Sequence, residues 1–89
     1  MMASELPEDH PLRIAHLMSS DHRGEIERSQ FCGCFYCKRT FGPDQIVEWV
    51  DDDSTALCPH CGIDSVIGDA SGIKLTEEFL RDMHAVWFS

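Results

Sequence analysis

The stretch FCGCFYCKRTF, residues 31–41, decides how this chain folds, because it places three of the five cysteines within six positions. The other two follow in ALCPHCGID. Together the two stretches contain two Cys-x-x-Cys pairs, Cys34 with Cys37 and Cys58 with Cys61, separated by twenty residues. A two-residue gap lets a tight turn aim both sulfurs at one ion about 2.3 Å away, and two such turns complete a tetrahedron. This spacing is typical of a four-thiolate zinc site.

We predict that these four cysteines bind one Zn²⁺ per chain, with iron as the alternative metal. In the second pair, Pro59 restricts the backbone φ of its turn, and Gly62 permits a positive φ just after the last ligand. Four thiolates fill the coordination sphere, whereas a catalytic zinc keeps one position open. The sequence therefore predicts a structural metal site and no catalytic residues.

Cys32 is the cysteine left over. Pairing it with Cys34 would leave one residue between the two sulfurs, which suits a single ion less well. We expect Cys32 to be a small buried residue or a neighbour of the metal site, with a pKa raised by the adjacent thiolates. The competing interpretation is a free or exchanging thiol.

The other residues that commonly bind metals or transfer protons do not form a second site. His60 lies between two predicted ligands and should point outward, while His16 and His22 are six apart and lie on different faces of any helix. No H-E-x-x-H pattern occurs. Asp64 and Asp69, near glycines, are more typical of turns than of acid–base chemistry.

Short strands are expected around the cysteines. Residues 46–50 are rich in β-formers, residues 51–54 favour a turn, and residues 55–57 lead into the second pair, which together predict a hairpin. The competing interpretation is a short helix over residues 43–50, begun by Gly-Pro-Asp. Residues 64–67 would add a third strand.

Helices are expected at both ends of the chain. From Pro11, apolar residues at Ile14, Leu17 and Met18 follow helical spacing, and a further helical turn is expected over residues 25–28.

Near the C-terminus, Thr76 is a suitable N-cap, and acids follow it in the first turn. An apolar helical face should then pack on the sheet beside Val47 or Trp49; it comprises Phe79, Leu80, Met83, Val86 and Trp87.

These features predict a small α+β metal-bound domain: a zinc-ribbon-like, three-stranded antiparallel β core with an N-terminal helical segment and a C-terminal amphipathic helix. Residues 1–9 should be a flexible N-terminus, and residues 10–89 a single zinc-ribbon-like domain. At 89 residues, a hydrophobic core alone gives marginal stability, so a metal is expected to reinforce it.

The charge of the chain disfavours nucleic acid as a partner. It has 7 Lys and Arg against 16 Asp and Glu, a formal charge of −9. Nucleic-acid binding requires a basic footprint, and Lys38-Arg39 is the sole local candidate. The sequence begins without a signal-peptide pattern, and no apolar run approaches the length of a membrane span. We therefore expect a cytoplasmic protein without membrane contact.

The chain resembles a family of small, largely uncharacterised bacterial zinc-ribbon proteins. The resemblance runs from about residue 12 to the C-terminus and rests on CGCFYC, EWVDDDSTALCPHCGIDSVIGD and EEFLRDMHAVWF. It implies a compact cytoplasmic protein with the same four cysteines as metal ligands, and it implies no activity. CPHCG is also similar to the second knuckle of rubredoxins, but Lys38-Arg39 follows the first pair where a rubredoxin has glycine.

Three functions are compatible with this pattern. The leading hypothesis is a structural zinc-binding module that acts through contacts with a partner protein, which the sequence does not identify. The alternatives are a rubredoxin-like electron-transfer protein and a nucleic-acid-associated zinc-ribbon accessory factor.

Overall fold

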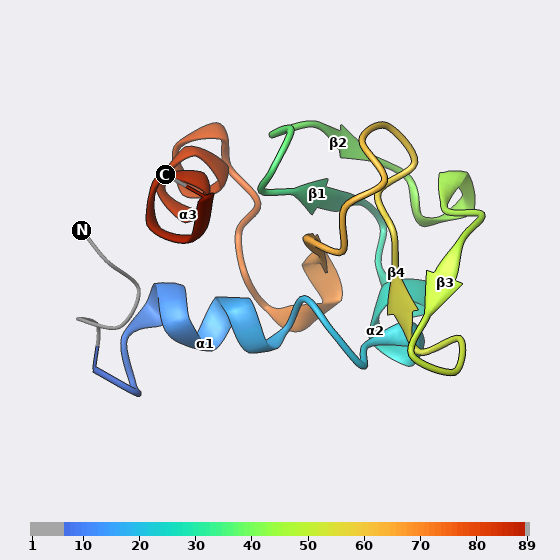
Figure 1. The fold of residues 1–89 in the computed structure, drawn as a ribbon, viewed down its shortest axis with the longest axis horizontal. Helices are drawn as coiled ribbons and strands as arrows, with labels where there is room; N and C mark the ends of the chain where they lie inside the picture. The colour runs from blue at the N-terminus through green and yellow to red at the C-terminus, as the bar shows by residue number, and fades with distance from the viewer. Residues whose placement is uncertain (1–6, 89) are drawn as a thin grey trace.

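Short helices and strands follow one another along the chain. A computed structural model describes residues 7–88, so residues 1–6 of the expected flexible N-terminus, and Ser89, lie outside the described residues. The elements, including two 3₁₀ turns labelled η, are α1 (Pro11–Leu17), α2 (Arg23–Arg28), β1 (Cys32–Cys34), β2 (Thr40–Phe41), η2 (Pro43–Gln45), β3 (Trp49–Val50), β4 (Thr55–Ala56), β5 (Val66–Gly68), η3 (Asp69–Ser71) and α3 (Glu77–Phe88). Figure 1 shows α1 and α3 at one end and the β3–β4 hairpin with α2 at the other.

The strands form two antiparallel sheets. One has three strands in the order β2-β1-β5, and the other is the β3–β4 hairpin. In the first sheet, Cys32 lies opposite both Phe41 and Gly68. The fold is thus α+β with antiparallel strands, as predicted, but the predicted three-stranded sheet made of the hairpin and residues 64–67 is wrong. The central strand is β1, whose residues are all buried, so it lacks the apolar–polar alternation that marks a half-exposed strand.

The hairpin over residues 46–57 forms as predicted. Trp49 pairs with Ala56, and Val50 pairs with Thr55. Of the alternative helix over residues 43–50, only the three residues of η2 are helical. The turn contains three consecutive aspartates, Asp51–Asp53, with φ angles of 55°, 58° and 65°. Aspartate adopts this left-handed region more readily than most residues, which explains why an aspartate run makes the turn here.

Helix α3 packs on the three-stranded sheet. Thr76 caps it as predicted, accepting a hydrogen bond from the Phe79 N–H at 3.1 Å. Leu80 approaches β1 at Gly33, where a Cβ atom would lie 3.2 Å from a Leu80 methyl group. Glycine at this position therefore allows the close approach of helix and strand. The buried cluster beneath α3 comprises Ala15, Phe35, Ile67, Leu75, Leu80 and Met83.

Trp87 packs on α1 and not on the hairpin, so the predicted contact with Val47 or Trp49 is wrong. The Trp87 ring stacks on His16 with centroids 3.9 Å apart, and its indole N–H donates to the Leu12 carbonyl at 3.3 Å. Val47 is 79% exposed. Trp49 instead lies under the Arg23 guanidinium of α2, 4.4 Å from the ring centroid. The hairpin is thus covered by α2, which leaves α1 as the partner of α3.

The face that α1 buries differs from the predicted one. Ala15 is buried, while Ile14 and Leu17 are 40% and 69% exposed. Leu12 and Met18 pack against the same cluster as Ala15. The predicted stripe of Ile14, Leu17 and Met18 is therefore rotated in the structure. The buried stripe includes a small alanine and a polar contact to Trp87, which a search for large apolar residues does not detect.

His22 joins the two ends of the molecule. Its Nε2 accepts the Ala56 N–H at 3.1 Å, which fixes the proton on Nδ1, and Nδ1 donates to the Met18 carbonyl at 2.7 Å. Its backbone N–H donates to the Ser54 carbonyl at 2.8 Å. Burial lowers the pKa of His22, although the Met18 carbonyl and the nearby acids Glu25 and Asp21 oppose this effect. The neutral ring thus connects α1 to the hairpin.

We predict that Trp87→Ala lowers the melting temperature of the metal-loaded protein by about 10 °C. A half-buried tryptophan that stacks on His16 should contribute about 2 kcal/mol, less than the 3–5 kcal/mol of a fully buried one. Thermal unfolding followed by circular dichroism measures the change. The control is Val47→Ala, which should change the melting temperature by less than about 3 °C because Val47 is exposed. Equal effects of the two substitutions would show that α3 is not held by this contact.

Candidate metal centre

Four cysteine sulfurs meet in one cluster. Those of Cys34, Cys37, Cys58 and Cys61 all lie within 4.8 Å of one another. Two pairs from opposite segments are closest: Cys34 and Cys61 at 3.6 Å, and Cys37 and Cys58 at 3.7 Å. A tetrahedral zinc site with 2.3 Å bonds separates its sulfurs by about 3.8 Å. The cluster therefore has the size of a four-thiolate metal site, formed by the four residues that the sequence predicted.

The first pair lies in a tight turn, the first knuckle, that begins at the end of β1. The Cys34 N–H donates to the Arg39 carbonyl at 2.9 Å, and the Lys38 N–H donates to the Cys34 carbonyl at 2.8 Å. Within the turn, the Tyr36 N–H points at the Cys34 sulfur at 3.4 Å, and the Arg39 N–H bonds the Cys37 sulfur. Both sulfurs therefore accept an amide hydrogen two residues further along the chain.

The second pair forms an equivalent turn, the second knuckle. The Cys58 N–H donates to the Ile63 carbonyl at 3.0 Å, and the Gly62 N–H donates to the Cys58 carbonyl at 2.9 Å. The His60 N–H points at the Cys58 sulfur at 3.4 Å, and the Ile63 N–H bonds the Cys61 sulfur. Each hydrogen bond of the first knuckle thus has a counterpart at the same spacing in the second. The equivalence follows from the Cys-x-x-Cys pattern that the two segments share.

The cluster favours a cation at its centre. Burial raises the pKa of Cys37, and the neighbouring sulfurs of Cys34 and Cys58 raise it further. Burial likewise raises the pKa of Cys61. At Cys58, burial acts in the same direction, but the amide hydrogen bonds of Cys61 and His60, with the side-chain hydrogen bonds of Cys61 and Cys37, outweigh it and lower the pKa. Four thiolates this close repel one another, so a divalent ion would replace the protons that otherwise neutralise them.

The cluster is attached to the sheet through Ser65, a contact that the sequence did not predict. The Ser65 hydroxyl lies 3.0 Å from the Cys34 sulfur, and its carbonyl accepts the Phe35 N–H at 3.1 Å. Ser65 is 1% exposed and directly precedes β5. A serine in a strand-forming stretch carries no sign of this contact, because it depends on how β5 pairs with β1.

Cys32 lies outside the four-sulfur cluster. It is fully buried, and burial with the nearby Asp69 raises its pKa to about 12. The predicted buried position and raised pKa are confirmed, but the cause is burial and Asp69, not the adjacent thiolates. The cysteines are unpaired as disulfides among the residues that the structure describes.

The histidine of the second knuckle points outward as expected. His60 is exposed; its Nδ1 lies 3.4 Å from an Arg39 guanidinium nitrogen, and its ring contacts Phe41 edge-on. His16 and His22 lie in separate surroundings, one against Trp87 and the other against the hairpin. In residues 7–88, the four cysteines are the group that can hold a metal.

Comparisons with known proteins assign no activity to this site. Comparisons with protein-family models, curated proteins and solved structures found no match. The resemblance to bacterial zinc-ribbon proteins therefore stays a prediction. None of the helices described, which lie between residues 7 and 88, is long and apolar enough to cross a membrane. What can be said of the site consequently comes from its geometry.

We predict that Cys32→Ser keeps one zinc per chain, whereas Cys34→Ser loses it. Cys34 belongs to the sulfur cluster and Cys32 does not. The two substitutions make the same chemical change two residues apart on the same strand, so each controls for the other. Zinc content after gel filtration, measured by elemental analysis, distinguishes them. Loss of zinc from Cys32→Ser with retention by Cys34→Ser would reverse the ligand assignment.

We predict that substitutions at the fifth position of each knuckle, counted from its first cysteine, have opposite effects on stability. Lys38 has a φ of 65° where its counterpart Gly62 has 78°. A non-glycine residue pays about 1–2 kcal/mol in this region, so Lys38→Gly should raise the free energy of unfolding by about 0.5–1 kcal/mol, after the entropic cost of glycine. Gly62→Ala should lower it by about 1–2 kcal/mol.

Strain alone explains the second effect, because a Cβ atom on Gly62 would meet nothing within 4 Å. Denaturant unfolding of the zinc-loaded proteins measures both values. Destabilisation by Lys38→Gly would show that its side chain contributes to the fold.

Proposed function

We propose that this protein is a structural zinc-binding module that acts through protein–protein contacts and has no catalytic activity at the metal. The observation that carries the proposal is the four-sulfur cluster itself. Its four ligands would fill a tetrahedral coordination sphere, and no position would remain for a substrate or an activated water. The cytoplasm, where thiols stay reduced, is the compartment that suits such a site.

The position of the cluster supports a structural role. Cys34 ends β1, the central strand, and Cys58 follows the hairpin by one residue. The cluster thus connects the sheet that carries α3 to the segment that leads out of the hairpin. The strands are two or three residues long, too short to hold the two parts firmly by backbone pairing alone. A metal bound by four cysteines would reinforce the buried cluster of Ile26, Ala56 and Val66, which packs α2 and the hairpin against the sheet.

Iron is the alternative metal, with rubredoxin-like electron transfer as the alternative function. Partial exposure of Cys37 and Cys61 favours it, because electrons must reach the metal from the surface. The amide hydrogen bonds to sulfur would also suit a site whose charge changes. Zinc remains the proposal because thiolate tetrahedra of this spacing are characteristic of structural zinc. A colourless protein with one zinc supports it, and a red protein with iron supports the alternative.

We predict that removal of the metal unfolds the protein. Structural zinc contributes about 10–16 kcal/mol in small zinc peptides at neutral pH, more than the roughly 5–15 kcal/mol that stabilises a whole domain. A strong chelator should therefore abolish the near-ultraviolet circular dichroism of Trp87 and Trp49, and added zinc should restore it. The Cys32→Ser protein serves as a control for thiol oxidation. An unchanged spectrum after verified zinc removal would contradict the structural role.

A further inference from the structure

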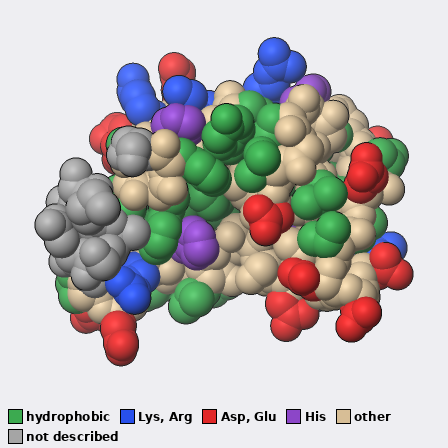
Figure 2. Space-filling view, in the orientation of Figure 1, with side chains coloured by type: hydrophobic (Ala, Val, Ile, Leu, Met, Phe, Trp, Pro, Cys, Tyr) green, Lys and Arg blue, Asp and Glu red, His purple; other side chains and the backbone are tan. Residues whose placement is uncertain are grey.

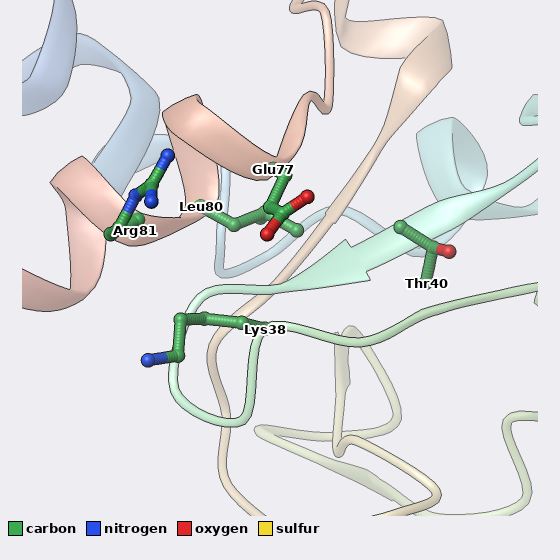
Figure 3. A pocket seen from close by; sticks show the side chains of 5 residues that line it. All are labelled: Lys38, Thr40, Glu77, Leu80 and Arg81. Carbon is green, nitrogen blue, oxygen red and sulfur yellow. The ribbon is translucent and has the colours of Figure 1, made fainter.

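A groove lies between α3 and the first knuckle. It encloses about 570 Å³ and is lined by Lys38, Thr40, Glu77, Leu80 and Arg81. Figure 3 shows the three helix residues on one side and Lys38 and Thr40 on the other. Leu80, at the base of the groove, is 1% exposed. The groove thus presents a cation on each wall, with Glu77 on the same wall as Arg81.

The two cations of the groove face solvent. Lys38 and Arg81 are exposed, and neither has an ion-pair partner within 4.0 Å among residues 7–88. Both are therefore open to an anion from another molecule. In the view of Figure 2, many acids lie along the lower and right margins, and acids also stand among the lysine, arginine and histidine side chains of the upper margin. The groove itself carries two cations and one acid, Glu77.

Exposed aromatic rings border the same part of the surface. Tyr36 of the first knuckle is 42% exposed and Phe88 of α3 is 39% exposed, and their rings meet edge-on with centroids 4.9 Å apart. His84 contacts both rings at 5.7 Å and lies one turn beyond Arg81 on α3. His84 also bonds the Phe35 carbonyl at 3.3 Å, which holds this border to the knuckle. The border offers apolar area to a partner in a fixed position.

Lys38 has a backbone conformation that favours glycine. It occupies the left-handed position that glycine occupies in the second knuckle. The knuckle requires the turn there and not a lysine, because the hydrogen bonds are made by backbone atoms. The exposed Lys38 side chain is therefore available for a contact outside the knuckle.

We propose that the groove between α3 and the first knuckle binds an acidic segment of a partner protein. A carboxylate of that segment would lie between Lys38 and Arg81, and a neighbouring apolar side chain would pack on the exposed Tyr36–Phe88 border. This inference rests on the proposed function and specifies its surface and partner chemistry. Charge complementarity selects an anionic partner.

A protein segment fits the groove better than a nucleic acid does. Nucleic-acid affinity arises from neutralising many phosphates along a strand, and the groove supplies two cations on a protein of charge −9. Glu77, also in the groove, would repel a continuous run of phosphates. It would tolerate a peptide segment whose negative charge lies only at the end beside Arg81. We therefore expect that neutralising Glu77 strengthens binding.

Selection from random dodecapeptides displayed on phage tests the proposal, with the zinc-loaded protein as target. Peptides enriched in Asp and Glu are expected. Their affinities are then measured by fluorescence polarisation with the parent and four variants, each with verified zinc content. Binding to Lys38→Gln/Arg81→Gln should weaken about tenfold, since each of the two exposed ion pairs contributes about threefold to the affinity. Glu77→Gln should tighten it about threefold.

Two variants serve as controls. Arg28→Gln removes an exposed cation on α2, outside the groove, and should change affinity less than twofold. Lys38→Gly should weaken binding severalfold while leaving the fold intact or more stable, which separates binding from stability. Retained affinity in both Lys38→Gly and the double variant would overturn the proposal, as would enriched peptides without acids or the absence of enriched peptides.

A nucleic acid is tested in parallel with a labelled dT12 oligonucleotide. Binding of dT12 that Lys38→Gln/Arg81→Gln abolishes would overturn the peptide assignment in favour of single-stranded nucleic acid. The wider proposed function is tested separately, by whether chelation unfolds the protein and by cross-linking of partner proteins in host lysate. Partners cross-linked elsewhere on the surface would leave the structural module intact and reject the groove.

Discussion

Four sulfurs held within 4.8 Å of one another are the constraint on which this structure depends. As thiolates the four sulfurs repel one another. As neutral thiols they accept the amide hydrogen bonds of the two knuckles only weakly. A central divalent cation would offset two of the four negative charges and would keep the amide–sulfur contacts. Among the described residues, no acid or histidine belongs to this group. The four cysteines alone would therefore bind the metal.

The rest of the molecule is arranged around this centre in two parts. The first knuckle continues β1, and its buried Phe35 packs with α1 and α3. The second knuckle follows the hairpin, and α2 packs against that hairpin. The parts share the four-sulfur cluster, the His22 hydrogen bonds and a buried apolar cluster that includes Ile26 of α2, Val66 of β5 and Ala56 of β4. Because the core of so small a chain gives only marginal stability, loss of a bound metal should weaken the connection between the two parts.

Local signals in the sequence predicted the features that depend on local geometry. The Cys-x-x-Cys spacing identified the four clustered cysteines, the aspartate run identified the hairpin turn, and Thr76 identified the start of α3. Features set by distant contacts could not be predicted in the same way. β1 contains a glycine between two cysteines and resembles no strand, yet its pairing with β5 decides where α3 packs. The predicted packing partner of Trp87 was wrong for that reason.

The equivalence of the two knuckles also shows where fold and function separate. The shared hydrogen-bond pattern requires the same backbone conformation in both knuckles, and glycine adopts it in the second knuckle with the least strain. Lysine adopts it in the first knuckle with more strain. The same lysine lines the groove beside α3 together with Arg81. The difference between two otherwise equivalent turns thus coincides with the surface that we propose for a partner, one residue away from the clustered Cys37.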